Sequence, residues 1–212
     1  MKTSSLLTAS ILLLSLGACD NEPAKGKPQA TAAAPVVASA APAPASAVKY
    51  AFSNTDSRIE FVGAKVTRKH DGSFERFTGS VNLVDNDPNK SSVTTEIDVA
   101  SIKSDEEKLT THLKSPDLLD VAAHPKATFN STSIKAGGDK GATHTVTGNL
   151  QLHGVTKSIT FPANVKLSAD TIDIDAEFAI NRKDFGIVYP GMPDDLIKDD
   201  VLLKLRIRAR RA

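Results

Sequence analysis

The sequence has no tryptophan, a single cysteine and few aromatic residues, and each shortage narrows the class of protein. Aromatic residues make up 5% of the 212 positions. One cysteine excludes an intramolecular disulfide and a zinc site built on cysteines. No apolar run reaches the roughly 18–20 residues that a membrane-spanning helix needs. The formal net charge is only +1, which disfavours a nucleic-acid-binding domain, because such domains usually carry a clear basic excess.

The first nineteen residues have the pattern of an export signal. Lys2 gives a positive start, and residues 6–16 form an apolar stretch of the length typical of a signal-peptide core. A Leu-Gly-Ala-Cys sequence ending at Cys19 resembles the lipobox of bacterial lipoproteins, in which the cysteine is acylated and becomes the new N-terminus. We therefore predict a lipoprotein signal peptide over residues 1–18 and lipidation of Cys19. An ordinary signal peptide with a chance cysteine is the alternative.

These predictions place the protein in the cell envelope or periplasm, anchored to a membrane by its lipidated cysteine. Two or more acyl chains anchor a protein stably, because each buried methylene contributes about 0.8 kcal/mol. The sequence does not tell which membrane holds the anchor.

The next segment, residues 19–47, is expected to be a lipidated cysteine followed by a disordered tether. Residues 20–47 contain 11 alanines, 5 prolines and no aromatic residue. Prolines interrupt helices, and alanine methyl groups bury too little surface to offset the entropy of ordering a chain. All the phenylalanines and tyrosines follow this segment, so residues 48–212 hold the core of one domain.

Apolar and polar residues alternate along this domain with a period of two, which predicts half-buried strands. The pattern indicates about eight strands, near residues 58–67, 77–83, 93–99, 126–134, 146–152, 159–167, 172–180 and 201–209. One segment differs: Ser104 and Glu107 match a capping box, and Leu109 and Leu113 fall on one helical face. We expect a short helix here that covers one end of the sheet.

An antiparallel sheet of this size with one apolar face can close into a barrel, which removes its edges. The predicted fold class is therefore all-β, an eight-stranded antiparallel barrel with a short capping helix. The interior of such a barrel is either filled by side chains or holds one small ligand. The inward positions of the last three strands carry no titratable group, which suits an apolar guest. The predicted lining residues are Phe77, Val81, Ile97, Val99, Phe129, Leu150, Leu152, Phe161, Val165, Ile174, Phe178, Ile180, Leu203 and Leu205.

Five motifs in order resemble the YceI-like family of bacterial polyisoprenoid-binding proteins. They lie at residues 72–79, 112–120, 124–129, 146–157 and 182–186, and the Leu-x-Leu-His-Gly-Val-Thr-Lys stretch at 150–157 is the most specific. The resemblance covers roughly residues 48–211. It implies a lipocalin-like barrel that holds a long isoprenoid or another amphiphilic lipid. Family members often have Arg-Asp shortly before the His-Leu pair, where this sequence has Leu109 and Thr110, which leaves the headgroup preference open.

Several polar features have both a functional and a structural interpretation. His112 is the best candidate for a contact with a lipid headgroup, because it lies on the predicted helix, but a solvated histidine is the alternative. The basic side chains Lys204, Arg206 and Arg208 fall on the outer face of the last strand. They either form a solvated face that discourages edge pairing or attract anionic headgroups. The long connection over 189–197 is either a rim of the ligand mouth or a structural excursion.

The leading hypothesis is a lipid-anchored carrier that binds or sequesters an isoprenoid or similar lipid. A ligand-free envelope protein with a filled barrel is one alternative, and a large cavity would distinguish the two. A lipid-modifying enzyme that uses His112 with Asp117 or Asp120 is the other, and it requires hydrogen-bonding distances between these groups. We predict no catalytic residue, no metal and no cofactor apart from a bound lipid, and no nucleic-acid partner. The oligomeric state stays open.

Overall fold

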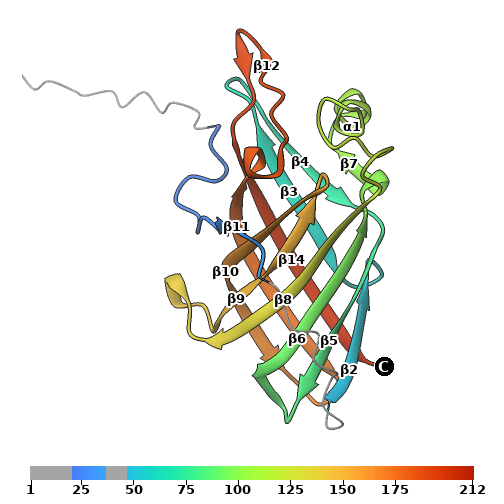
Figure 1. Ribbon diagram of the computed structural model, residues 1–212, viewed down its shortest axis with the longest axis vertical. Coiled ribbons are helices and arrows are strands. Elements are labelled where there is room, and N and C mark those ends of the chain that lie inside the picture. Colours follow the sequence, from blue (N-terminus) through green and yellow to red (C-terminus); the bar gives the residue numbers. More distant parts are fainter. Residues whose placement is uncertain (1–20, 37–46) are drawn as a thin grey trace, which may run out of the picture.

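The alternating strands close into an antiparallel barrel (Figure 1). The computed structural model describes residues 21–36 and 47–212. Within this part of the chain, eight strands form the closed ring, each paired antiparallel with its neighbours, which confirms the predicted fold class. In ring order they are β2 (Ala47–Ser53), β5 (Phe77–Val84), β6 (Asp87–Asp98), β8 (Lys126–Ala136), β9 (His144–Leu152), β10 (Val155–Leu167), β11 (Thr171–Asn181) and β14 (Asp200–Arg211).

The membership of the ring differs from the prediction in one strand. β2 was not predicted, whereas the predicted strand near 58–67, which is β3 (Arg58–Ala64), lies beside the ring. β3 pairs with the first half of β14, and β2 pairs with its last residues. The sheet therefore branches at one end, where β4 (Lys69–Phe74) and β7 (Ile102–Ser104) continue outward from β3.

The single α-helix of the described residues, α1 (Glu107–Leu113), lies at this branched end (Figure 1). The predicted capping box does not form, because the N-cap is Glu106 and its side chain makes no capping hydrogen bond. Ser104 instead belongs to β7, and its hydroxyl both accepts from the backbone N–H of Glu106 and donates to the carbonyl of that residue. The remaining short elements are η1 (Val99–Ser101), η2 (Asp139–Gly141), η3 (Arg182–Phe185) and the hairpin of β12 (Gly191–Met192) and β13 (Asp195–Leu196).

Residues 28–33, which we call the strap, occupy a gap in the barrel wall. β10 and β11 pair with each other only over 164–167 and 172–175. Beyond that stretch the strap lies between them: β1 (Thr31–Ala33) pairs with β10, and the N–H of Ala30 donates to the carbonyl of Ala179 in β11 over 2.8 Å. The Ala179 N–H returns a 2.8 Å bond to the carbonyl of Pro28.

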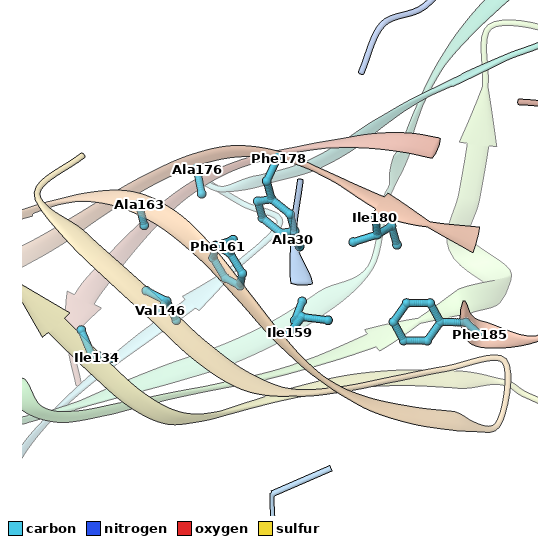
Figure 2. Packing of buried hydrophobic residues seen from close by; sticks show 10 residues of the cluster. All are labelled: Ala30, Ile134, Val146, Ile159, Phe161, Ala163, Ala176, Phe178, Ile180 and Phe185. Atoms are coloured by element: carbon cyan, nitrogen blue, oxygen red, sulfur yellow. The ribbon is translucent and has the colours of Figure 1, made fainter. Parts of the chain in front are cut away.

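The strap contradicts part of the predicted tether. Ala30 is 7% exposed and belongs to the same buried cluster as Phe161 and Phe178 (Figure 2). Alanine and proline bury little surface alone, but here backbone hydrogen bonds on both sides of the strap supply the ordering energy. The expected disorder is therefore wrong for residues 21–36, and residues 37–46 lie outside the described part of the chain.

Candidate functional site

The interior of the barrel contains a cavity of about 570 Å³, within the range of roughly 300–1,000 Å³ typical of small-molecule sites. Its wall is almost entirely apolar and is contributed by the strands of the ring together with β3, β4 and α1. Inward-facing side chains such as Ile174, Leu203 and Leu205 line the cavity yet are only half-buried. Tightly packed core side chains would be fully covered, so this partial exposure indicates free space at the centre of the barrel.

Most of the predicted lining residues lie on the cavity wall. These are Val81, Ile97, Phe129, Leu150, Leu152, Phe161, Val165, Ile174, Phe178, Ile180, Leu203 and Leu205. Whether they contact a ligand stays a prediction.

Phe77 and Val99 lie off the wall, which corrects the prediction for these two residues. Phe77, 4% exposed, is covered by its own cluster, which includes Phe74 and Ile97. Val99, 1% exposed, begins the turn η1, where the period-two alternation of β6 ends, and packs with Leu118 instead.

Sequence reasoning missed the wall residues that come from β2 and β4 and the residues that follow α1. They include Phe52, His70, Phe74, Leu118 and Leu119. The alternation of Val48, Tyr50 and Phe52 is a usable strand signal, although it directly follows the alanine-rich segment.

Charged side chains of the wall gather at one end of the cavity, which we call the mouth. The mouth is formed by α1, the β3–β4 turn and the segment 187–197. The charged and imidazole side chains there are those of Lys65, His70, Glu106, Lys108, His112, Arg182 and Asp195. The predicted rim over 189–197 does contribute wall residues, among them Tyr189 and Met192. The cavity thus has an apolar body and one polar end, the same division as in an amphiphile.

His112 projects from α1 at the mouth. Its Nε2 lies 3.0 Å from Asp117 Oδ2, and its ring meets that of Tyr189 edge-on, with 5.1 Å between ring centroids. Asp120, the other acid considered, is engaged elsewhere: its carboxylate accepts a long 3.4 Å hydrogen bond from the backbone N–H of Ala123. The histidine is about one-third exposed, so it is both oriented and accessible.

Arg182, in η3, holds one side of the mouth in place. Its guanidinium donates to the carbonyl oxygens of Ile187 at 2.6 Å and Lys198 at 3.1 Å, and it lies 3.3 Å from Asp199 Oδ1. The residue is 4% exposed. Burial lowers the pKa of Arg182, and the charge of Asp199 only partly offsets this effect. A guanidinium stays protonated even so, and its bonds tie the two ends of the segment 187–198 together.

A second polar pair, with a buried histidine and a partly exposed carboxylate, lies at the mouth. His70 Nδ1 lies 2.9 Å from Asp105 Oδ1, and His70 is 6% exposed. Burial raises the pKa of Asp105, but hydrogen bonds and the charges of His70 and Arg68 outweigh it, so the pKa is lowered. The carboxylate therefore stays ionised and orients the imidazole at the cavity wall.

The basic outer face of β14 is partly neutralised. Arg208 Nε lies 2.7 Å from Asp173 Oδ1, and Arg210 Nε lies 2.6 Å from Asp56 Oδ2. The hydrogen bond to Asp173 raises the pKa of Arg208. These pairings favour the interpretation of a solvated, ion-paired face over that of a phosphate-binding patch.

Neither a metal site nor a membrane-spanning helix is found in the described ranges. No group of three or more His, Cys, Asp or Glu residues there has an arrangement suited to a metal ion. None of the helices formed by these residues has the length and apolar character needed to cross a bilayer. The predicted signal peptide and Cys19 lie outside the described residues.

Comparison with known proteins decides the family. The model of the YceI-like domain matches residues 50–209. The chain belongs to the YceI-like family. Among curated YceI-like relatives, a UPF0312 protein of Pseudomonas putida is 35% identical over 136 residues, which cover 61% of this chain and 70% of the relative. Protein YceI of Salmonella arizonae is 35% identical over 122 residues, covering 55% of this chain and 62% of that protein.

Solved structures of similar proteins share the fold. BcnA of Burkholderia cenocepacia superimposes with a TM-score of 0.64 at 24% identity, over 74% of this chain and 98% of BcnA. A polyisoprenoid binding domain of Saccharophagus degradans, implicated in plant cell wall breakdown, gives a TM-score of 0.61 at 18% identity, over 78% of this chain and 99% of that domain. At these identities the likeness establishes the barrel architecture alone.

Proposed function

We propose that this YceI-like protein binds an isoprenoid or similar amphiphilic lipid in the bacterial cell envelope, with the apolar chain in the barrel and the headgroup at the mouth. One observation carries the proposal: a cavity of about 570 Å³ has apolar walls throughout its body and charged side chains at one end. The polyisoprenoid-binding description of the similar Saccharophagus domain supports the same class of ligand.

Apolar burial alone provides enough free energy for useful affinity. Each buried methylene contributes about 0.8 kcal/mol, so ten of them contribute about 8 kcal/mol before the costs of association. That gross value would give a dissociation constant near 1 μM only if association cost nothing, so a chain longer than ten methylenes is needed to offset these costs. Binding by apolar burial selects lipids by the length and width of their chains, and it needs no polar side chain inside the barrel.

At the mouth, His112 is the proposed headgroup contact. Its bond to Asp117 fixes the ring orientation, and its partial exposure leaves an edge available to a phosphate or hydroxyl group. The proposed role is binding, with no catalytic step. Acylation of Cys19 and anchoring to an envelope membrane complete the proposal and rest on the sequence pattern.

The direct test is to identify what the protein carries. We would purify it from its native host, extract it with organic solvent and analyse the extract by mass spectrometry. A Leu205→Trp variant, which narrows the cavity, is the matched control, because it shares the anchor and surface of the parent. We expect one lipid class near equimolar amounts with the parent and depletion with the variant. Equal lipid profiles from both proteins would contradict the proposal.

A further inference from the structure

Exposed apolar side chains gather at the mouth end of the barrel. Among the described residues, the large apolar side chains with high exposure are Val36, Val66, Val188, Met192 and Leu196. All except Val36 lie in the β3–β4 turn or in the segment that carries the β12–β13 hairpin. Single exposed apolar residues are ordinary, but a group at one extremity marks an interaction surface.

The two segments form one structural unit, which we call the apolar tip and define as residues 65–68 and 191–196. The N–H of Val66 donates to the carbonyl of Leu196 over 3.1 Å, and Lys65 Nζ lies 2.7 Å from Asp195 Oδ2. The hydroxyl of Thr67 donates to the other oxygen of that carboxylate. The tip is therefore held together by polar contacts between the two segments while Val66, Met192 and Leu196 project outward. It stands at the extremity of the barrel in Figure 1.

The tip borders the cavity directly. Lys65, Met192 and Asp195 belong to the cavity wall as well as to the tip. A molecule that enters or leaves the barrel at the mouth passes these side chains.

The N-terminal segment arrives at the same place. The side-chain amide of Asn21 donates to the carbonyl of Val66 over 3.2 Å, and Lys198 pairs with Glu22 at 3.0 Å. Cys19 precedes Asn21 by two residues, and two residues of extended chain span at most about 7 Å. The first described residue, Asn21, therefore lies at the tip and follows the predicted acylation site closely in sequence.

The charges of the tip are balanced. Within the tip, Lys65 and Arg68 are offset by Asp194 and Asp195. Lys65 pairs with Asp195, and Arg68 pairs at 3.3 Å with Glu106, which lies outside the tip. The hydrogen bond from Lys65 lowers the pKa of Asp195 against the opposing effect of burial, so this carboxylate stays ionised. A surface of this kind does not select anionic headgroups, and its attraction to a partner comes from its apolar side chains.

We propose that the apolar tip docks onto a lipid bilayer, so that the mouth of the barrel faces the membrane and a lipid passes between bilayer and cavity without crossing water. A bilayer fits better than a protein partner because the tip is small, charge-balanced and at the extremity of the barrel, and because the chain leads to it from a predicted acylation site. Docking of this kind rests on the proposed lipid binding and gives the protein a membrane-facing surface and an orientation.

The absence of tryptophan allows a clean test. A Met192→Trp variant carries one fluorophore at the tip. An Ala169→Trp variant, the matched control, carries it at the exposed β10–β11 turn, which lies at the opposite end of the barrel. Each mature protein, acylated at Cys19, is reconstituted in phosphatidylcholine vesicles with or without brominated acyl chains. We expect bromine to quench at least half of the emission of the first variant and less than a tenth of the second.

Further measurements distinguish apolar insertion of the tip from electrostatic attraction to the vesicle. Adding Leu196→Glu to the Met192→Trp variant should at least halve the quenching, because a carboxylate resists transfer into hydrocarbon. Quenching should not change in 0.5 M NaCl or with added phosphatidylglycerol. Equal quenching of the two single variants, or quenching lost in salt, would overturn the proposed docking. Mass spectrometry of the lipid that copurifies with each variant tests the cavity separately, so either proposal can fail alone.

Discussion

Replacing Leu205 with tryptophan should block the cavity while leaving the barrel folded. Leu205 packs against two of the three core clusters and thus lies near the middle of the cavity, where its side chain is half-buried. Because free space lies beside it, the larger ring extends into the cavity and strains few neighbours. We expect the free energy of unfolding to fall by less than about 1 kcal/mol, against the 1–3 kcal/mol typical of overpacking in a filled core.

The loss of affinity follows from the part of the cavity that the ring closes off. Ile207, two residues beyond Leu205, is the last residue of β14 on the cavity wall, so about 7 Å of the cavity wall extends past the blockage along β14. This length holds about five methylenes, and a chain excluded from it loses about 4 kcal/mol of burial. The dissociation constant should therefore rise by about a thousandfold.

The assay is a titration with parinaric acid, a polyene fatty acid that fluoresces in apolar sites, beside a thermal melt without ligand. Residues 21–212 are used, so that no signal sequence or acyl chain competes for the probe. A Leu205→Met variant is the control, because it conserves volume. Unchanged affinity together with a melting temperature lowered by about 3 °C or more, the shift expected for about 1 kcal/mol, would refute the reasoning and indicate a filled core.

Three further predictions follow from other features. Cys19→Ala should abolish incorporation of radiolabelled palmitate, and undiminished labelling would exclude acylation at this residue. Ala30→Asp should detach the strap, because it places a carboxylate in a buried apolar site. Hydrogen exchange at the Ala179 amide should then accelerate at least a hundredfold. Full protection of this amide would show that the strap tolerates the charge. Arg182→Met should lower the free energy of unfolding by about 3 kcal/mol, because the carbonyl of Lys198 and its neighbours lose their donor. A denaturant titration measures this loss, and a change below about 0.5 kcal/mol would contradict the proposed support of the mouth.

The barrel was predictable because a strand with one solvent-exposed face and one buried face alternates polar and apolar residues along the sequence. The stretch 159–167 alternates cleanly, and 172–180 and 201–209 alternate except at Ala179 and Leu202. The three stretches correspond to parts of β10, β11 and β14. The apolar character of the lining follows from the same alternation. Most of the candidate wall was thus accessible from sequence.

The strap and the supports of the mouth were not predictable, because they depend on tertiary contacts. The strap has only small side chains, and it becomes ordered because β10 and β11 diverge and leave backbone groups for it to pair with. Arg182 has no periodic pattern that marks it as buried, and its partners are carbonyl oxygens of the segment 187–198. Residues 109–110, where the sequence departs from the family motif, indicate neither the strap nor the buried position of Arg182.

The position of β14 in the ring has a consequence for the order of folding. β14 pairs with β2, β3 and β11, and in one of these ladders Leu205 faces Ile59. Contacts between residues so far apart in the sequence form slowly, because a long loop must close first. Until residues 200–211 have emerged and docked, the edges of β2, β3 and β11 stay unpaired and can capture strands of other chains. A chain that lacks residues 200–211 is an open sheet with unpaired edges, so it is prone to aggregate until this last strand pairs.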